Sequence, residues 1–509
     1  MAIDLFHKGI SDIIKEFKLA TAFPREAEVE ARRLNGEIAD GELRDREDLR
    51  HETIVTIDGE TAKDFDDAVS VATTGTGGYL LKVSIADVSH FVTPGSPIDR
   101  EAYRRATSTY FPDRALPMLP ERLSNDLCSL VPHQDRLAFT AEMEFDAKGC
   151  RIASRFYRSV IRSRARLTYT EVRKILGDRD EHARLRHLSL LEDLERMGEL
   201  AKILHMVRIA RGSLDFDLPE PFIDLNITEG TIERIVKAER NLAHRLIEEF
   251  MIAANEAVAE FITERGLPMI YRVHQEPDPE RVNDFSVLLH HLGHGLRLGK
   301  RVRPMALAAV IEAVRGRPEE KLVNTVLLRT MAKAVYDIKN VGHFGLASQC
   351  YTHFTSPIRR YPDLIVHRLL WQALRGGRAR PAGKERGGAS ARRLKEMAGH
   401  CSERERMSMK AEWASRDLAA AIFLKPKVGQ RFEGIISGVA KFGFFVELSP
   451  FFVEGLVSIK NLKDDGYTFH EKAHALVGRK LKKKYQIGNP VSVLIRGVNL
   501  ERRWIDFTL

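Results

Sequence analysis

Cysteines and long apolar runs are both scarce in this sequence. Only four cysteines occur among 509 residues, at Cys128, Cys150, Cys350 and Cys401, and none belongs to a C-x-x-C pair or a His/Cys metal spacing. This argues against a disulfide framework and a structural zinc site, and it favours a reducing cytoplasm. No stretch of about 18 apolar residues is present, and charged residues interrupt the first apolar positions, so neither a membrane span nor a signal peptide is expected.

Positive charge is abundant by contrast, and it is unevenly distributed. The net charge is +9, and residues 426–509 contain 14 Lys and Arg against 8 Asp and Glu. The segment 375–393 contains seven basic residues against one Glu, and its Gly, Pro and Ser content is typical of a surface loop. Such concentrations indicate a polyanionic partner, although basic residues that merely keep a loop solvated would give the same pattern.

The order of the expected elements predicts an α+β protein. Residues 1–50 form a lead-in segment that is too short for a core of its own. Short β-rich runs follow, and then helical patterns at 189–212, 241–266 and 402–424. Strands followed by helices predict one α+β domain over residues 51–425. After Pro426 and Gly429, short Gly-punctuated strands predict a small β-barrel over residues 426–509.

Four aspartates lie close together in the segment TIDGETAKDFDDAVSV (56–71), at Asp58, Asp64, Asp66 and Asp67. Like charges this close raise one another's pKa unless cations compensate them. Neighbouring residues of a regular strand point to opposite faces, so Asp66 and Asp67 can converge only in a loop or a bent segment. Carboxylates without Cys or His partners favour Mg²⁺ or Mn²⁺, and two such ions suit phosphodiester hydrolysis. An acidic surface loop or a calcium site are the alternatives, although the spacing does not follow the calcium-loop pattern.

A second polar cluster lies in GHFGLASQCYTHFTSPIRRYPDLIVHR (342–368). Pro357 suits the first turn of a helix, with Thr355 or Ser356 as its cap. The free N–H groups of such a helix start, together with Arg359, predict a phosphate-binding corner. Taken alone, the segment would equally fit a capped helix with surface arginines.

Several motifs together resemble the ribonuclease II/ribonuclease R family, in that family's order. They are TIDGETAKDFDDAV, SIADVSHFV, YFPDRALPMLPERLSNDLCSLVP, RLTYTEV, IEEFMIAAN and GHFGLASQCYTHFTSPIRRYPDLIVHR. The later stretch GQRFEGIISGVAKFGFFVELSPFFVEGLVSIKNL resembles an OB-fold RNA-binding domain of the ribosomal-protein S-one type. This stretch is closer to ribonuclease R than to ribonuclease II.

The resemblance implies a catalytic RNB domain followed by an OB-fold. It also implies processive 3′→5′ hydrolysis of single-stranded RNA to nucleoside 5′-monophosphates in RNA turnover, with Mg²⁺ as cofactor and Mn²⁺ as a substitute. Metal binding would fall to Asp58, Asp64, Asp66 and Asp67, with Asp58 and Asp67 as the most direct ligands. Catalysis would depend on Asp66, Asp64 and Arg359, whose guanidinium would stabilise charge on the scissile phosphate.

The resemblance also assigns RNA contacts. Tyr110 would stack on the terminal base, and Phe216 would sandwich the bases from the other side. Tyr169 and Glu248 would contact the terminal nucleotide, with Glu249 as the neighbouring alternative. Aromatic stacking accepts every base, which suits an exonuclease, and a group such as Glu248 or Tyr169 on the ribose 2′-hydroxyl would distinguish RNA from DNA.

In the expected barrel, three phenylalanines lie beside Lys441 in KFGFFVEL. On a regular strand, Phe442 and Phe444 share one face and Phe445 points to the other. We expect Phe442, Phe444 and Lys441 to form an exposed platform for single-stranded RNA, and Phe445 to fill the barrel core. The basic run 479–488 would add a salt-sensitive contact to the RNA backbone.

The resemblance has one clear departure. Family members usually carry cold-shock OB-folds ahead of the catalytic domain, whereas only residues 1–50 precede the first motif here, so we expect those modules to be absent. We expect a cytoplasmic monomer that acts on single-stranded RNA, with an RNA-degradation complex as a candidate partner. A non-catalytic RNA-binding protein and a phosphoesterase for small molecules are the competing interpretations. The uncompensated carboxylates argue against the first, and the basic C-terminal region argues against the second.

Overall fold

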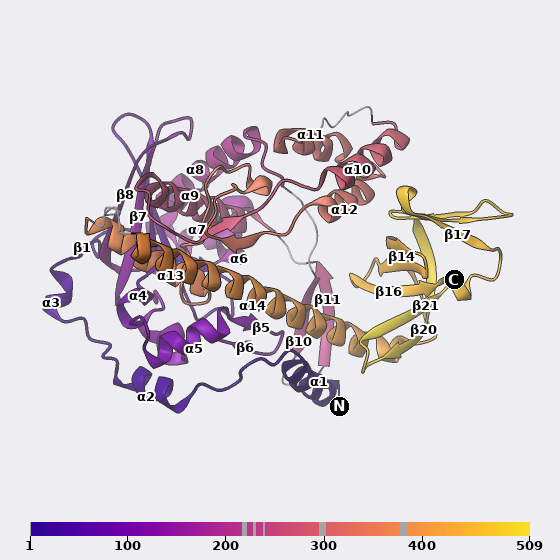
Figure 1. Ribbon diagram of the computed structural model, residues 1–509, viewed down its shortest axis with the longest axis horizontal. Coiled ribbons are helices and arrows are strands. Elements are labelled where there is room, and N and C mark those ends of the chain that lie inside the picture. The colour runs from indigo at the N-terminus through magenta and orange to yellow at the C-terminus, as the bar shows by residue number, and fades with distance from the viewer. Residues whose placement is uncertain (1, 216–220, 227–230, 238–239, 295–301, 377–383) are drawn as a thin grey trace.

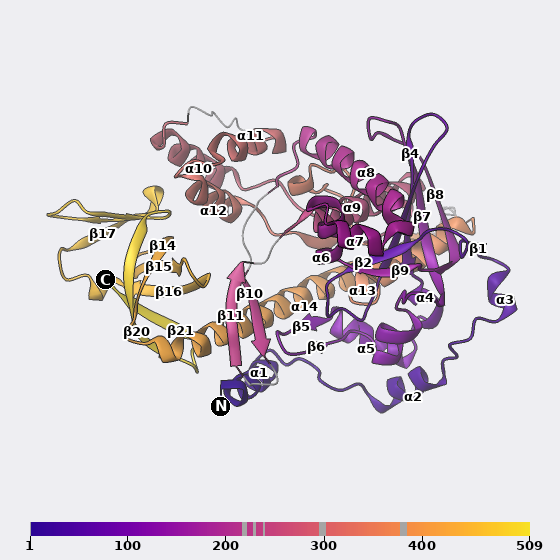
Figure 2. The same cartoon turned by 180° about the vertical axis from the view of Figure 1, so that it is seen from behind.

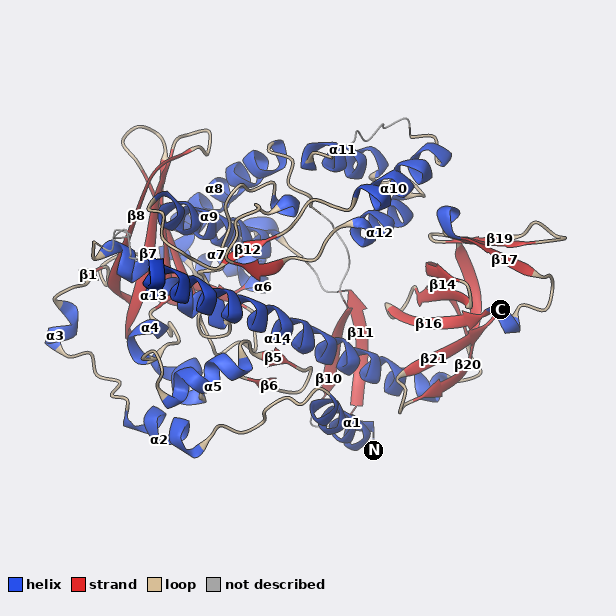
Figure 3. Cartoon of the chain, in the orientation of Figure 1, coloured by secondary structure: helices blue, strands red, loops and turns tan. Residues whose placement is uncertain are grey.

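Two strand-rich parts lie at opposite ends of the molecule, with helices between them (Figure 3). The computed structural model describes residues 2–509 apart from 216–220, 227–230, 238–239, 295–301 and 377–383. The long helix α14 (Lys384–Leu424) runs from one end to the other (Figure 1). Its 41 residues correspond to about 60 Å at the usual rise per residue. This mixture of helices and strands confirms the predicted α+β class.

The larger sheet has, within the described residues, seven strands in the order β1-β8-β7-β4-β3-β2-β9. These strands are β1 (Glu47–Asp48), β2 (Val55–Asp58), β3 (Asp67–Thr73), β4 (Tyr79–Ala86), β7 (Asp135–Phe145), β8 (Arg151–Arg162) and β9 (Ala165–Thr168). The neighbours from β2 to β8 pair antiparallel, whereas β9 joins β2 in parallel and β1 joins β8 in parallel. The sheet therefore brings Asp58 at the end of β2 beside the end of β9.

Alternate residues of this sheet enter two separate cores, as strand geometry requires. Leu81, Val83 and Ile85 of β4 pack in one core with α8 (Leu191–Ala210) and α9 (Leu242–Glu264). The intervening small residues, such as Ala68 and Ala86, pack in the other core with α5 (Pro97–Arg105), α13 (Tyr361–Leu374) and the start of α14. Helices therefore cover both faces of the sheet.

The remaining short elements of this part connect the sheet to its helices. They are α2 (Arg25–Arg33), α3 (Asp40–Leu43), α4 (Val88–Phe91), β5 (Thr109–Tyr110), β6 (Ala115–Leu116), α6 (Tyr169–Val172), α7 (Glu181–Arg186), β12 (Tyr271–Val273) and β13 (Val335–Asp337). Local sequence explains many of the boundaries. The N-cap side chain of Asn241, for example, accepts hydrogen bonds from the N–H groups of Ala243 and His244 and so starts α9.

The predicted helices at 189–212 and 241–266 correspond to α8 and α9, but the predicted surface loop at 375–393 is wrong for its second half. Residues 384–393 form the beginning of α14. The Arg-, Lys- and Ala-rich sequence that follows Gly388 favours a helix, and Leu394, Ala398 and Cys401 anchor that helix in the core.

The N-terminal segment is more than a lead-in. Helix α1 (Ala2–Glu16) buries Phe6, Ile10 and Ile13 against the C-terminal half of α14. The hairpin β10 (Pro221–Asn226) and β11 (Thr231–Lys237) lies beside both helices (Figure 2). Segments that are distant in the sequence therefore form one small core, which also includes Phe111 and Leu116.

The C-terminal region confirms the predicted OB-type barrel. A closed barrel is formed by β14 (Arg431–Ala440), β15 (Gly443–Leu448), β16 (Val453–Ser458), β20 (Pro490–Asn499) and β21 (Trp504–Thr508). A smaller sheet of β17 (Tyr467–His470), β18 (Ala475–Gly478) and β19 (Lys484–Gln486) is attached to it. The barrel shares its apolar core with α10 (Pro279–His291), α11 (Pro304–Val314) and α12 (Glu320–Thr330).

None of the helices in the described part of the chain combines the length and the apolarity needed to cross a bilayer. All four cysteines are described, and all four are free thiols.

Candidate active site and nucleic-acid interface

The connection between β2 and β3 carries the aspartate cluster. Asp58 is the last residue of β2 and Asp67 the first of β3, while Asp64 and Asp66 lie in the irregular segment between them. The prediction that these aspartates need a non-strand segment is therefore confirmed. Phe65 anchors this segment, because its side chain is buried in the core.

Ser129 holds the same segment in place through two hydrogen bonds. Its hydroxyl donates to the Lys63 carbonyl at 2.7 Å and accepts from the Phe65 N–H at 3.0 Å. The Phe65 carbonyl accepts in turn from Leu130 N–H at 3.0 Å. The aspartates therefore lie on a fixed loop, which is what a site with defined geometry needs. Sequence reasoning missed this support from Ser129.

The buried carboxylate of Asp66 connects the aspartate loop to the segment that carries Arg359. One oxygen, Oδ1, accepts from the Ile358 N–H at 2.8 Å. The other, Oδ2, is buried without a hydrogen-bond partner, and Arg359 Nε lies 3.6 Å away from it. The Arg359 side chain is 43% exposed and donates to Ser356 Oγ at 3.0 Å. A cationic group therefore borders the aspartates while remaining accessible to an anion.

The predicted helix start at Pro357 is wrong. Residues 357–359 form a turn, and α13 begins at Tyr361, with Pro362 in its first turn. Proline suits the first helical turn, and the second of the two prolines occupies it here. The side chain of Asp363 stabilises the turn, because it accepts from the Ser356 N–H at 2.8 Å and from Arg360 at 2.7 and 3.0 Å. Arg359 therefore projects from a turn instead of from a helix end.

Parallel pairing places Tyr169 beside the aspartates. Asp58 is the β-pair partner of Thr168, the residue that caps α6, and Tyr169 is the first residue of that helix. The capping box T-Y-T-E fixes this helix start, since Thr168 and Glu171 exchange hydrogen bonds. The ring of Tyr169 stacks on His244 of α9, with centroids 3.9 Å apart and planes 20° apart. Sequence reasoning missed His244.

One face of α9 completes the site. Glu248, Met251, Ile252 and Asn255 share this face at helical spacing and line the same cavity. Glu248 therefore faces the site, whereas Glu249, the alternative, is 2% exposed and points into the protein. The choice of Glu248 over Glu249 as the residue that contacts the nucleotide agrees with this placement.

A single cavity of about 240 Å³ brings most of the predicted catalytic residues together. Its lining includes the four aspartates, Arg359, Tyr169 and Glu248, along with other polar residues of the 351–360 segment. The lining residues are Asp58, Asp64, Asp66, Asp67, Tyr169, Ile247, Glu248, Met251, Ile252, Asn255, Tyr351, His353, Thr355, Ser356, Arg359 and Arg360.

The negative charge of the carboxylates in this cavity is not balanced by nearby positive charge. Burial raises the pKa of Asp58 to about 8, and repulsion from Asp67 and Asp64 adds to the shift. Burial also raises the pKa of Asp67 to about 6 and that of Asp66 well above its usual value, although Arg359 opposes both shifts. The arginines nearby therefore do not supply enough positive charge to keep all the aspartates ionised.

The donor set suits a hard divalent cation. All the candidate ligands are carboxylates, and one oxygen each of Asp58 and Asp66 is buried without a hydrogen-bond partner. Orphaned anionic oxygens of this kind are costly unless a cation satisfies them. Among the described residues, however, no three His, Cys, Asp or Glu side chains are already gathered tightly enough to hold an ion. The ligand set of Asp58, Asp64, Asp66 and Asp67 therefore stays a prediction.

Tyr110 lies at the edge of the aspartate loop. Its hydroxyl donates to Asp64 Oδ2 at 3.0 Å, its backbone N–H donates to Glu412 at 2.9 Å, and 42% of the residue is exposed. An exposed ring beside the site is compatible with stacking on a base. Phe216, the second predicted stacking residue, lies outside the described residues.

The predicted aromatic platform of the barrel needs a correction. Phe444 is fully buried and stacks on Tyr485 with centroids 4.7 Å apart, so its assignment as an exposed RNA contact is wrong. Phe442 is 56% exposed and Phe445 is partly exposed, with their rings 6.1 Å apart. Lys441 is exposed beside them. The exposed pair is therefore Phe442 and Phe445 instead of Phe442 and Phe444.

Phe444 is buried because a turn before β15 interrupts the alternation of inward and outward side chains. Lys441 and Phe442 form the tip of the hairpin between β14 and β15, and the second strand starts only at Gly443, with φ of +153°. From Phe444 onward, every second residue of β15 (Phe444, Val446 and Leu448) points into the barrel.

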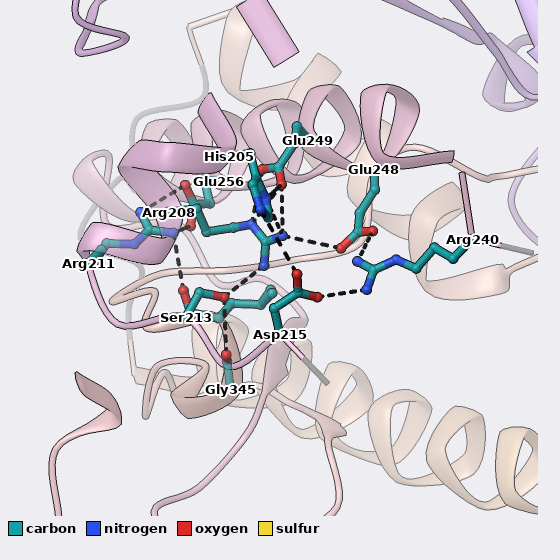
Figure 4. A network of polar contacts seen from close by, with 11 residues as sticks. His205, Arg208, Arg211, Ser213, Asp215, Arg240, Glu248, Glu249, Glu256 and Gly345 are labelled. Carbon is teal, nitrogen blue, oxygen red and sulfur yellow. Dashed lines mark hydrogen bonds and ion pairs between the residues drawn. The ribbon is translucent and has the colours of Figure 1, made fainter. Parts of the chain in front are cut away.

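A network of ion pairs behind Glu248 was not predicted. It connects α8, α9 and the segment 213–215, and Figure 4 shows its members. They are His205, Arg208, Arg211, Ser213, Asp215, Arg240, Glu248, Glu249, Glu256 and Gly345. Arg208 and Glu249 form its buried centre, with side chains only 4% and 2% exposed.

Comparison with known proteins agrees with this architecture. Residues 46–376 match the family model of the RNB domain, and residues 425–509 match that of the S1 RNA binding domain. Ribonuclease R of Aquifex aeolicus is 46% identical over 501 residues, which cover 98% of this chain and 70% of that protein. Ribonuclease R of Escherichia coli is 41% identical over 516 residues, covering 100% of this chain and 62% of that protein.

Solved structures show the same relationship. The apo form of Mycoplasma genitalium RNase R superimposes with a TM-score of 0.90 at 30% identity, over 98% of this chain and 77% of that one. The same enzyme in complex with ribose methylated single-stranded RNA gives a TM-score of 0.88. Because the RNB model covers more than half of the chain and the Aquifex aeolicus relative is matched over 70% of its length, this chain belongs to the ribonuclease R family of RNB-domain exoribonucleases.

Proposed function

We propose that this chain is a processive 3′→5′ exoribonuclease that hydrolyses single-stranded RNA to nucleoside 5′-monophosphates in RNA turnover. We further propose Mg²⁺ as its cofactor, with Mn²⁺ as a substitute, and a monomer in the cytoplasm as its working form. The observation that carries this proposal is the cavity that joins the four aspartates to Arg359, Tyr169 and Glu248. The relatives named ribonuclease R and the RNA complex of the Mycoplasma genitalium enzyme support it.

The aspartates would hold the metal. Asp58 and Asp67 are the most direct candidates, and Asp64 and Asp66 would complete the set. Two Mg²⁺ ions, when bound, would supply an activated water and stabilise the leaving oxygen. A non-catalytic RNA-binding protein would gain nothing from buried carboxylates that repel the RNA backbone, and this favours catalysis over binding alone.

Side chains of the chain itself would position the RNA. Arg359 borders Asp66 at 3.6 Å and is accessible, so its guanidinium can neutralise charge that develops on the scissile phosphate. Tyr110 would stack on a base without reading its identity. Glu248 and Tyr169 line the same cavity as the aspartates, where they can contact the ribose of the terminal nucleotide.

A direct test is degradation of a 5′-labelled single-stranded RNA with Mg²⁺ by the wild type and by Asp66→Asn. The wild type should shorten the RNA to a small end product and release 5′-monophosphates. The variant should be slower by about 100-fold or more, because it loses a carboxylate at the reacting centre. RNA that both proteins bind without degrading would contradict the proposed activity, and equal degradation by both would contradict the site assignment.

A further inference from the structure

The carboxylate of Glu248 is held by two arginines (Figure 4). Arg240 Nη2 donates to Oε2 at 2.6 Å, and Arg208 Nη2 donates to Oε1 at 3.5 Å. A carboxylate offers about four lone-pair sites, so two remain available after these contacts. Glu248 also lines the active-site cavity, and its side chain is 34% exposed. It is therefore an anchored acceptor with free capacity toward a substrate.

Arg240 makes a second contact with its other terminal nitrogen. Its Nη1 donates to Asp215 Oδ1 at 2.7 Å, so one guanidinium bridges two carboxylates from different segments. Attraction to Arg240 and neighbouring arginines outweighs the effect of burial and lowers the pKa of Asp215. A planar guanidinium has the donor geometry for such a bridge, whereas a lysine ammonium does not reproduce it.

The segment that carries Asp215 is itself held in place by hydrogen bonds. The Leu214 N–H donates to the Gly345 carbonyl at 2.8 Å, and Ser213 Oγ accepts from Arg208 Nη1 at 2.8 Å. The buried side chain of Arg208 also contacts Glu249 at 2.7 Å. Asp215 is thus attached to the same rigid centre as α9, and Arg240 transfers that support to Glu248.

Arg240 has no comparable contact with the aspartate cluster, and its partners are Asp215 and Glu248 alone among the contacts of the described residues. Its side chain is 32% exposed, so a direct contact with an RNA phosphate is the competing role. The two roles differ in outcome. A phosphate contact acts on every substrate and depends on salt, whereas an orienting role acts only where the oriented group acts.

We propose that Arg240 is a positioning residue that, by bridging Asp215 and Glu248, orients Glu248 as the acceptor for a ribose 2′-hydroxyl and thereby sets the preference for RNA over DNA. This inference rests on the proposed exoribonuclease function. It assigns to Arg240 and Asp215 an effect on sugar selection although neither lines the cavity.

The test uses the full chain, an oligoribonucleotide, and versions of it with a single 2′-deoxy sugar at each of the last four positions. Single-turnover rates give the ribose-to-deoxyribose rate ratio at each position. In Arg240→Ala, Arg240→Lys and Asp215→Asn, the largest of these ratios should fall by roughly tenfold, because each substitution breaks the guanidinium bridge that holds Glu248. Glu248→Gln should lower the same ratio, and Arg240→Ala should add little to it in the double variant.

Arg234→Ala is the matched control, because Arg234 forms an ion pair with Asp224 at 2.8 Å on the β10–β11 hairpin. It should leave every ratio unchanged. Unchanged ratios in Arg240→Ala would overturn the inference, as would an equal slowing at all positions with a smaller salt dependence, which would assign Arg240 to a phosphate. If Arg240→Ala does not fold, Asp215→Asn decides in the same way. A wild type that degrades no RNA would instead refute the proposed function itself.

Discussion

Two acidic clusters lie near the candidate active-site cavity, one lining it and one behind α9, and they are compensated in opposite ways. On the aspartate loop, burial raises the pKa of Asp58 and Asp66, and each of these residues has a buried oxygen without a hydrogen-bond partner. Behind α9, Arg208 pairs with Glu249 and Arg240 pairs with Asp215, whose pKa is lowered. The difference shows that the positive charge nearby, not the number of acids, distinguishes carboxylates that suit a metal ion from carboxylates that support the structure.

The same contrast indicates different roles for the two clusters. A carboxylate that is unpaired and buried costs stability, and such a cost persists where a bound cation recovers it. A carboxylate that is paired with arginine is held in one orientation and gains rigidity instead. The aspartate loop therefore has the properties expected of the proposed metal site, and the network behind α9 has those expected of the proposed support for Glu248.

The largest expected effect comes from breaking the paired cluster at its centre. Glu249→Gln removes the nearest carboxylate from the buried Arg208 guanidinium, which then keeps only a 3.5 Å contact with the carboxylate of Glu248, and this should lower the free energy of unfolding by about 3–5 kcal/mol. Chemical denaturation measures the change. Asp224→Asn removes half of an exposed ion pair and should cost less than about 1 kcal/mol. Equal, small effects in both variants would contradict the view that the network is a structural support.

Sequence patterns predicted the aspartate loop well, because its geometry is local. Asp58 and Asp67 bound a short connection between two β-rich runs, and neighbouring aspartates can converge only if that connection is irregular. The helix at 241–266 was equally predictable from its period, and it places Glu248 on the cavity side. Both predictions rest on residues that are close in the sequence and on simple strand and helix geometry.

The paired cluster could not be predicted in the same way. Arg208, Asp215 and Arg240 come from three separate segments, and only the packing of α8 against α9 brings them together. The prediction for the barrel was wrong for another reason. The turn before Gly443 shifts the alternation of inward and outward side chains, and this buries Phe444. Long-range pairing and the exact position of a turn are both invisible to periodicity alone.

A smaller effect should separate the clusters by the sign of their pH dependence. Because the folded pKa of Asp58 is raised to about 8, its contribution to stability is present at low pH and is lost as the pH rises from about 4 to 8. Asp58→Asn should therefore raise the melting temperature of the metal-free protein at pH 8, on the order of 2–4 °C, with little change at pH 4. Thermal melts across this range test the expectation.

Asp215→Asn is the mirror variant for that measurement. The pKa of Asp215 is lowered, so its stabilising contribution is present above its unfolded pKa and is lost as the pH falls through its folded value. This substitution should lower the melting temperature at pH 8. Addition of Mg²⁺ should raise the melting temperature of the wild type and do so less in Asp58→Asn. Shifts of the same sign in both variants would remove the distinction between the clusters.

The smallest expected effect concerns the neutral donor on the aspartate side. Tyr110 is hydrogen-bonded to Asp64 through its hydroxyl and exposes its ring, so two substitutions separate these two roles. Tyr110→Phe removes only the hydrogen bond and should change the Mg²⁺ concentration for half-maximal activity by a few-fold at most, in line with about 0.5–1.5 kcal/mol for one hydrogen bond. Tyr110→Ala also removes the ring and should change the length of the final RNA product, as gel analysis of a 5′-labelled substrate would show. The same end product from both variants would mean that Tyr110 supports the aspartate loop without stacking on the RNA.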